Sequence, residues 1–143
     1  MALLSSSRVY NDLIDLSVEV FKITRGINRD YRMSIGRRME DCVLGIADHL
    51  LLANSSEDAE CVRQHMLAMA EYERLQFLMS TAVRIPVGID AKEGRMTCIS
   101  IRQQARLSVR MTAIGKQMTG LRRYAEKKLR EKIKGQPQST DGL

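Results

Sequence analysis

Apolar residues recur at alternating spacings of three and four along most of the chain, which predicts amphipathic α-helices. The longest such stretch is residues 97–134, which holds no proline and only two glycines. Its regularly spaced apolar positions are Leu107, Met111, Ile114, Met118, Leu121 and Ala125. This spacing is typical of a helix that packs in a bundle.

Three earlier stretches have the same spacing and predict three more helices. The first, which Ser7 can cap, has its apolar stripe at Leu13, Leu16, Val20, Ile23 and Ile27. The second begins near Asp30 or Tyr31 and has its stripe at Ile35, Met39, Cys42, Val43, Ile46, Leu50 and Ala53. The third, which Ser55 or Ser56 can cap, has its stripe at Val62, Met66, Met69, Tyr72, Leu75 and Met79.

The links between these helices complete the predicted fold. Asn54 opens a short turn, whereas Pro86, Gly88 and Gly94 mark a longer connection over residues 84–96. We therefore predict an all-α fold, an antiparallel up-down four-helix bundle with a longer connection between the third and fourth helices. One domain spans residues 1–134, and the Gly, Pro and Ser content of residues 135–143 predicts a disordered tail.

The amino-acid composition agrees with a helical core. The chain has 143 residues, enough for one domain, and 44% of them are hydrophobic. Nine Met and two Pro favour helices over a sandwich or barrel. Because aromatic residues make up only 4% of the chain, we expect a core of Leu, Ile, Val, Met and Ala.

The net charge of +6 is unevenly distributed. Residues 56–80 hold two basic and five acidic residues, whereas residues 96–119 hold four basic residues and no acidic one. Residues 120–143 hold seven basic and three acidic residues. A basic face segregated in this way favours a polyanion such as RNA or DNA as partner. The alternative is a solvated helix back that only confers solubility.

The fourth predicted helix supplies the candidate nucleic-acid-binding residues, which cover a broad arc opposite its apolar stripe. They are Arg102, Arg106, Arg110, Lys116, Arg123, Lys127, Lys128 and Arg130. Arg102, Arg106 and Arg110 recur every four residues, and guanidinium groups suit phosphate oxygens. Tyr124 is the main aromatic residue on this face, so there is no base-stacking platform. We expect strongly salt-dependent and weakly specific binding.

Small residues on the same helix leave two interpretations open. Ala105, Val109 and Ala113 form a strip away from the apolar stripe. Gly115 and Gly120 interrupt a strong helix at a cost of about 1 kcal/mol each relative to Ala. These residues are either tolerated on an exposed face or admit a neighbouring subunit.

Catalytic chemistry has little support in the sequence. His49 and His65 have no partner at the spacing of metal ligands, so we expect a structural role for both. Glu71 and Glu73 are expected to be solvated charges. The sequence has no Gly-rich phosphate loop after a strand and no nucleophile elbow. It therefore predicts neither an enzyme nor a metal or cofactor site.

Cysteine usage and hydropathy bear on localisation. Cys42, Cys61 and Cys98 are odd in number and lack zinc-motif spacing, so we expect reduced thiols in a cytoplasmic protein. Cys42 lies among core positions and is expected to pack there. No segment has the length and apolarity of a signal sequence or a membrane span, so no membrane partner is expected.

Three segments carry a resemblance to a known family. They are residues 24–39, with YRMSIGRRM at 31–39, residues 72–85, which begin YERLQFL, and residues 114–122, IGKQMTGLR. In this order they resemble the Avd family, the accessory variability determinants of diversity-generating retroelements. That family belongs with four-helix proteins encoded in ribosomal RNA intervening sequences. The resemblance covers residues 10–128, with Leu121 at a position where Trp is common.

The resemblance implies a function and partners. Avd proteins are non-catalytic four-helix bundles that assemble into basic, barrel-like homopentamers. They bind the reverse transcriptase and template RNA of their retroelement and support mutagenic copying of that RNA into complementary DNA. The expected partners are thus template RNA or its hybrid with complementary DNA, a reverse transcriptase, and further copies of the chain. The alternatives are a stand-alone RNA-binding bundle of the intervening-sequence type, without a reverse transcriptase partner, and a purely structural oligomer.

Overall fold

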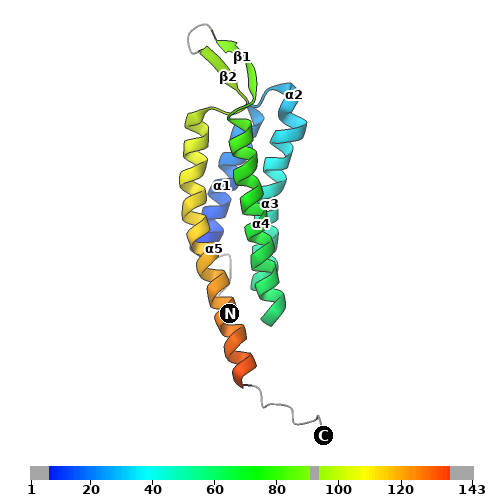
Figure 1. The fold of residues 1–143 in the computed structure, drawn as a ribbon, viewed down its shortest axis with the longest axis vertical. Coiled ribbons are helices and arrows are strands. Elements are labelled where there is room, and N and C mark those ends of the chain that lie inside the picture. The colour runs from blue at the N-terminus through cyan, green and yellow to red at the C-terminus, as the bar shows by residue number, and fades with distance from the viewer. Residues whose placement is uncertain (1–6, 91–93, 136–143) are drawn as a thin grey trace.

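The computed structural model describes residues 7–90 and 94–135 of the chain. Four long helices lie side by side along the long axis of the molecule, and a small β-hairpin stands at one end (Figure 1). These helices are α1 (Arg8–Arg25), α3 (Arg37–Asn54), α4 (Asp58–Ala82) and α5 (Ile101–Gly135). The prediction of four helices is confirmed. The predicted tail, apart from Gly135 at the end of α5, lies outside the described residues.

The core contains most of the predicted apolar positions. All five stripe residues of α1 and its neighbouring turn are buried, and the second stripe is buried except for the partly covered Ile35. In α5 the exception is Leu121, whose side chain is 36% exposed. Leu121 lies one turn beyond Gln117, which contacts Asp12 in the second turn of α1. The described part of α1 therefore begins at about the level of Leu121 and covers it little.

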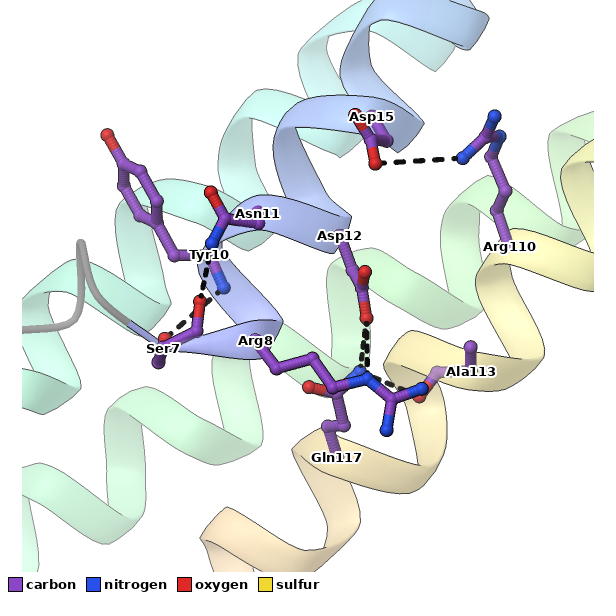
Figure 2. Close-up of polar contacts among 9 residues, drawn as sticks. All are labelled: Ser7, Arg8, Tyr10, Asn11, Asp12, Asp15, Arg110, Ala113 and Gln117. Carbon is purple, nitrogen blue, oxygen red and sulfur yellow. Dashed lines mark hydrogen bonds and ion pairs between the residues drawn. The ribbon is translucent and has the colours of Figure 1, made fainter.

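The start of α1 confirms the predicted cap. Ser7 Oγ accepts a hydrogen bond of 3.3 Å from the backbone N–H of Tyr10, which satisfies one of the free donors of the first turn (Figure 2). The second predicted helix begins in the same manner, because Asn28 Oδ1 accepts a bond of 2.9 Å from the N–H of Asp30.

This second helix is interrupted by a wider turn. It opens as α2 (Arg29–Tyr31), continues as a π-helix over Arg32–Gly36, and only then becomes α3. Gly36 is buried, and a Cβ built on it would lie 3.5 Å from Ile27 and 3.6 Å from Thr24. The small residue thus brings the π-helix into contact with the end of α1.

The buried face of α4 differs from the predicted stripe. Met66 is 57% exposed, whereas Gln64 and Ala68 are buried. The observed face follows three-four spacing at Gln64, Ala68, Tyr72, Leu75, Met79 and Ala82. The polar Gln64 can be buried there because its Oε1 lies within hydrogen-bond distance of His49 Nδ1 of α3, at 2.7 Å. The placement of Met66 in the core was therefore wrong, since a paired amide and a methyl side chain occupy the positions that face α3.

The predicted serine cap of α4 is also wrong. The hydroxyls of Ser55 and Ser56 donate to the carbonyls of Leu51 and Leu52 and so close the end of α3. The N-cap residue of α4 is Glu57, whose side chain makes no capping hydrogen bond. The next residue, Asp58, has φ 56°, a left-handed conformation that is uncommon outside glycine.

The long connection forms a β-hairpin, which the all-α prediction did not include. Strands β1 (Pro86–Asp90) and β2 (Gly94–Thr97) pair antiparallel. The hairpin is tied to the bundle where Cys98 N–H donates to the carbonyl of Ile85 at 3.0 Å. Helix α5 then starts at Ile101 rather than Thr97.

The start of α5 is a capping box. Ser100 Oγ accepts from the N–H of Gln103 at 3.0 Å, and Gln103 Oε1 accepts from the N–H of Ser100 at 2.9 Å. Ser100-x-x-Gln103 is a sequence signature of a helix start, so it places this boundary four residues later than the apolar pattern did. Within the described chain, no helix is long and apolar enough to cross a membrane.

Candidate nucleic-acid interface

One side of α5 carries basic residues and no acidic residue, and most of these basic residues lie in the second half of the helix. At about 100° per residue, ten positions fall within about 80° of the helix circumference. We call them the outer arc: Arg102, Ala105, Val109, Thr112, Lys116, Gly120, Arg123, Lys127, Arg130 and Lys134. Six of these residues are cationic, and the other four carry no charge. The outer arc therefore holds no acidic residue over about 48 Å of helix, at about 1.5 Å per residue.

The cations of the outer arc are free to meet a ligand. All six side chains are exposed, and in the described part of the chain none of them forms an ion pair within 4 Å. Five of them are predicted binding residues. The sixth, Lys134, was missed, although it lies on the same wheel position as Lys116.

Two predicted binding residues lie elsewhere, at the edge of α5 that faces α1. Arg106 Nη1 is 3.7 Å from Glu19 Oε1. Figure 2 shows the second pair, in which Arg110 Nη1 is 3.9 Å from Asp15 Oδ2. The reason is geometric: each four-residue step turns about 40° past a full turn, so the series that begins at Arg102 drifts toward α1. The carboxylates there reduce the positive charge that this edge presents to a phosphate.

The eighth predicted residue, Lys128, faces the acidic start of α4. Together with Lys132 it lines a groove of about 390 Å³ that also contains Glu57 and Asp58. Lys132 Nζ donates to Asp58 Oδ2 at 2.6 Å, and this hydrogen bond raises the pKa of the ammonium group. The structure therefore divides the eight predicted residues into five on the outer arc and three beside carboxylates.

A second groove, which we call the α4–α5 groove, runs beside the outer arc. It has a volume of about 420 Å³, and Lys116 and Arg123 contribute cations to it. Thr112 and Thr119 add hydroxyl groups from α5, and Tyr72 of α4 also lines the groove. The groove thus places two cations next to neutral hydrogen-bonding groups, an arrangement that suits a phosphate group.

Gly115 has a specific packing role at the floor of this groove. Tyr72 Oη donates a buried hydrogen bond of 2.7 Å to the carbonyl of Met111. A Cβ on Gly115 would lie 2.6 Å from that Oη, so the hydroxyl fits only because Gly115 has no side chain. A Cβ on Gly120 would have no atom of the described residues within 4 Å, and Val109 is 74% exposed. Of the small residues on α5, Gly115 is thus explained by packing within the chain.

Several other titratable groups have structural partners. Glu71, expected to be a solvated charge, instead has a half-buried side chain that accepts a hydrogen bond from Arg74. Burial, followed by the nearby Glu71 carboxylate, raises the pKa of the Cys42 thiol to about 11. His65 differs, because its Nδ1 has no hydrogen-bond partner among the described residues, and burial lowers its pKa. The raised pKa keeps the Cys42 thiol protonated, and a protonated thiol is a poor nucleophile.

The remaining chemistry of the described chain offers little besides this interface. No group of three or more His, Cys, Asp or Glu residues in residues 7–90 and 94–135 could hold a metal ion, and the three cysteines are free. No protein-family model, curated protein or solved structure matches this chain. What the site can bind follows from its charge and shape.

Proposed function

We propose that this chain is a non-catalytic RNA-binding protein whose outer arc contacts phosphates of the RNA backbone. The observation that carries the proposal is the outer arc itself, with six exposed cations, no acid and no ion pair on the described chain. A solubilising surface needs no such segregation, because mixed charges serve that purpose as well. Arg106, Arg110 and Lys128 contribute less, because carboxylates of α1 and α4 lie beside them.

The salt dependence of binding tests this proposal. A single-stranded RNA that contacts six cations gives a slope of about −4 for the logarithm of the association constant against the logarithm of salt concentration. The measurement is a fluorescence-anisotropy titration of the full chain with labelled RNA at several salt concentrations. No binding at about 150 mM salt, or a slope near zero, would falsify the proposal and favour a purely structural oligomer.

We further propose that this RNA-binding protein is the accessory subunit of a retroelement reverse transcriptase. The support is the resemblance of residues 24–39, 72–85 and 114–122 to the Avd family. In that role it would bind template RNA or its hybrid with complementary DNA and support mutagenic copying. A pull-down from cells that carry the native locus is the test, and a reverse transcriptase should be recovered together with its template RNA.

The alternative is a stand-alone RNA-binding bundle of the intervening-sequence type. The outer arc supports this alternative and the accessory-subunit role equally, because all outer-arc residues come from one helix and need no second protein to bind RNA. Recovery of RNA without a reverse transcriptase in the same pull-down would support this alternative.

The proposed protein is an up-down antiparallel bundle that forms homo-oligomers, with a pentamer implied by the resemblance. The contacts between α1 and α5 support the antiparallel arrangement, because they pair residue numbers in opposite order. They join Asp12 to Gln117, Asp15 to Arg110, and Glu19 to Arg106.

A contact between subunits is supported by exposed apolar residues on α3, which are Leu44, Leu51 and Leu52. Light scattering of the purified chain measures the mass.

A further inference from the structure

A second concentration of positive charge lies at the π-helix end of the bundle, separate from α5. Residues 22–38 hold six basic residues and one acidic residue. The six are Lys22, Arg25, Arg29, Arg32, Arg37 and Arg38. All are exposed, and on the described chain none forms an ion pair within 4 Å. Arg29 and Arg32 lie in the first turns of a helix, where the macrodipole disfavours cations, so helix stability does not account for them.

Three of these cations meet in a groove, which we call the α1–π groove. Lys22 and Arg25 of α1 and Arg32 of the π-helix line it, and its volume is about 700 Å³. Phe21 and Val18 of α1 form an apolar wall and are 41% and 48% exposed. The groove therefore combines an aromatic ring that solvent can reach with three cations that have no acidic partner.

Two charged side chains of the α1–π groove, Arg32 and Glu40, have hydrogen-bond partners within the chain. Arg32 Nη2 donates to the carbonyl of Arg25 at 3.0 Å, which holds the guanidinium at the end of α1. A guanidinium has five N–H donors, so the others can meet a ligand. Glu40 also lines the groove, but its Oε2 accepts a hydrogen bond of 2.5 Å from the buried Thr24 hydroxyl. A π-helical turn within an α-helix is often found at a functional site, and Arg32 is the first residue of the π-helix here.

We propose that the α1–π groove binds one unpaired nucleotide of a single-stranded RNA. Its phosphate would lie on Lys22, Arg25 and Arg32, and its base against the ring of Phe21. The groove volume is that of a site for a small ligand. A base stacks on an aromatic ring only when it is free of its own helix, so this site prefers a single strand to a duplex. The inference goes beyond the function proposed for the outer arc, whose phosphate contacts do not require unpaired bases.

Two variants of the full chain test the base and the phosphate separately. Phe21→Leu keeps the apolar wall and removes the aromatic ring, and Arg25→Gln removes one charge from an exposed side chain. Their matched controls are Phe77→Leu and Arg84→Gln, which change an exposed Phe and an exposed Arg of the α4 region outside the groove. The probes are a short unstructured RNA strand and the duplex that it forms with its complement.

The expected result is selective. Phe21→Leu weakens binding of the single strand roughly fivefold or more and leaves binding of the duplex and the salt slope unchanged. Arg25→Gln weakens single-strand binding and reduces the salt slope by about 0.7. The two control variants bind the single strand within about twofold of the wild type.

Three results would overturn the inference. These are unchanged single-strand binding by both groove variants, equal losses for strand and duplex, or a change in oligomeric mass with Phe21→Leu, which assigns the groove to a subunit contact. The outer arc is judged separately. Loss of binding on replacing Arg123 and Arg130, with no effect of the groove variants, retains the proposed function and rejects only the groove. Loss of binding by the groove variants, with no effect of replacing Arg123 and Arg130, retains the α1–π groove and rejects the outer arc.

Discussion

The outer arc of α5 and the edge that α5 turns toward α1 are built from the same residue types, but they differ in charge environment. On the outer arc, Arg123 and Arg130 have no acidic partner in the described chain, whereas Arg106 and Arg110 lie 3.7 and 3.9 Å from carboxylates of α1. The residue type alone therefore does not fix the charge that a helix face presents, because carboxylates of a packed neighbour compensate part of it.

The largest expected effect concerns the floor of the α4–α5 groove beside the outer arc. Gly115→Leu should lower the free energy of unfolding by about 3 kcal/mol, because the new side chain displaces Tyr72 and breaks its buried bond to Met111. Urea denaturation followed by circular dichroism measures this change. Gly120→Ala is the control, and it should raise stability by up to about 1 kcal/mol since its Cβ meets no other atom. Unchanged stability of Gly115→Leu would show that the packing at Tyr72 is loose.

The next effect distinguishes the two sides of α5 directly. Replacing Arg123 and Arg130 with Gln should weaken binding of single-stranded RNA about tenfold, or about 1.4 kcal/mol, and should reduce the salt slope by about 1.4. The matched pair is Arg106→Gln with Arg110→Gln, which removes the same charge but should cost less than half as much affinity. Anisotropy titrations at several salt concentrations give both quantities. Equal losses for the two pairs contradict the distinction between them.

A smaller effect of opposite sign should follow when the α1 carboxylates are neutralised. Asp15→Asn together with Glu19→Gln frees Arg106 and Arg110, so RNA binding should become roughly two- to threefold tighter. The free energy of unfolding should fall by about 1 kcal/mol or less, because the Asp15–Arg110 pair is exposed and the Arg106 side of the other pair is open to solvent. Asp48→Asn with Glu73→Gln serves as the control, because these exposed acids lie outside the ion pairs found on the described chain. If both double variants tighten binding equally, only net charge matters.

The smallest effect is a pH dependence on the α4 side. Burial lowers the pKa of His65 below its ordinary value of 6.5, so the unfolded chain takes up a proton before the folded protein does. The stability contributed by neutral His65 is therefore present above pH 6.5 and is lost as the pH falls from 6.5 to the lower pKa of the folded state. His65→Gln should remove this loss, so the wild type and the variant should differ in slope only below pH 6.5. Parallel curves in urea denaturation would show that His65 titrates as in the unfolded chain.

Much of the bundle could be predicted because large aliphatic residues mark its core. The stripes of α1 and α3 fall on buried positions almost without exception. In α4 the predicted positions Tyr72, Leu75 and Met79 are buried, but the first half of its buried face could not be found in this manner, because Gln64 is buried through a partner on another helix, His49. The position of the β-hairpin also depends on tertiary contacts, among them the backbone bond from Cys98 to Ile85 and the packing of Val87 against the core.

The candidate site was predictable in residue type but not in electrostatics. Basic residues on α5 are evident in the sequence, and the wheel position of Lys116 also identifies Lys134. The neutralisation of Arg106 and Arg110 depends on Glu19 and Asp15, which lie far away along the chain and approach only when the helices pack. The α1–π groove needed the structure as well, because α1 and the π-helix contribute its lining together.

The last turns of α5 extend beyond the other helices at the end opposite the hairpin (Figure 1). Ala125 is the last buried residue of this helix, and the turns beyond it contact the start of α4 through the groove at Lys128 and the bond from Lys132 to Asp58. These turns are therefore held less firmly than the core turns. Such a segment opens locally without unfolding the bundle, and its amide protons should exchange with solvent much faster than those of the core turns. If the chain binds RNA as proposed, part of the binding free energy would be spent on ordering these turns, and binding should slow their exchange. The dense positive charge at the end of α5 is thus carried by turns that should open more readily than the core.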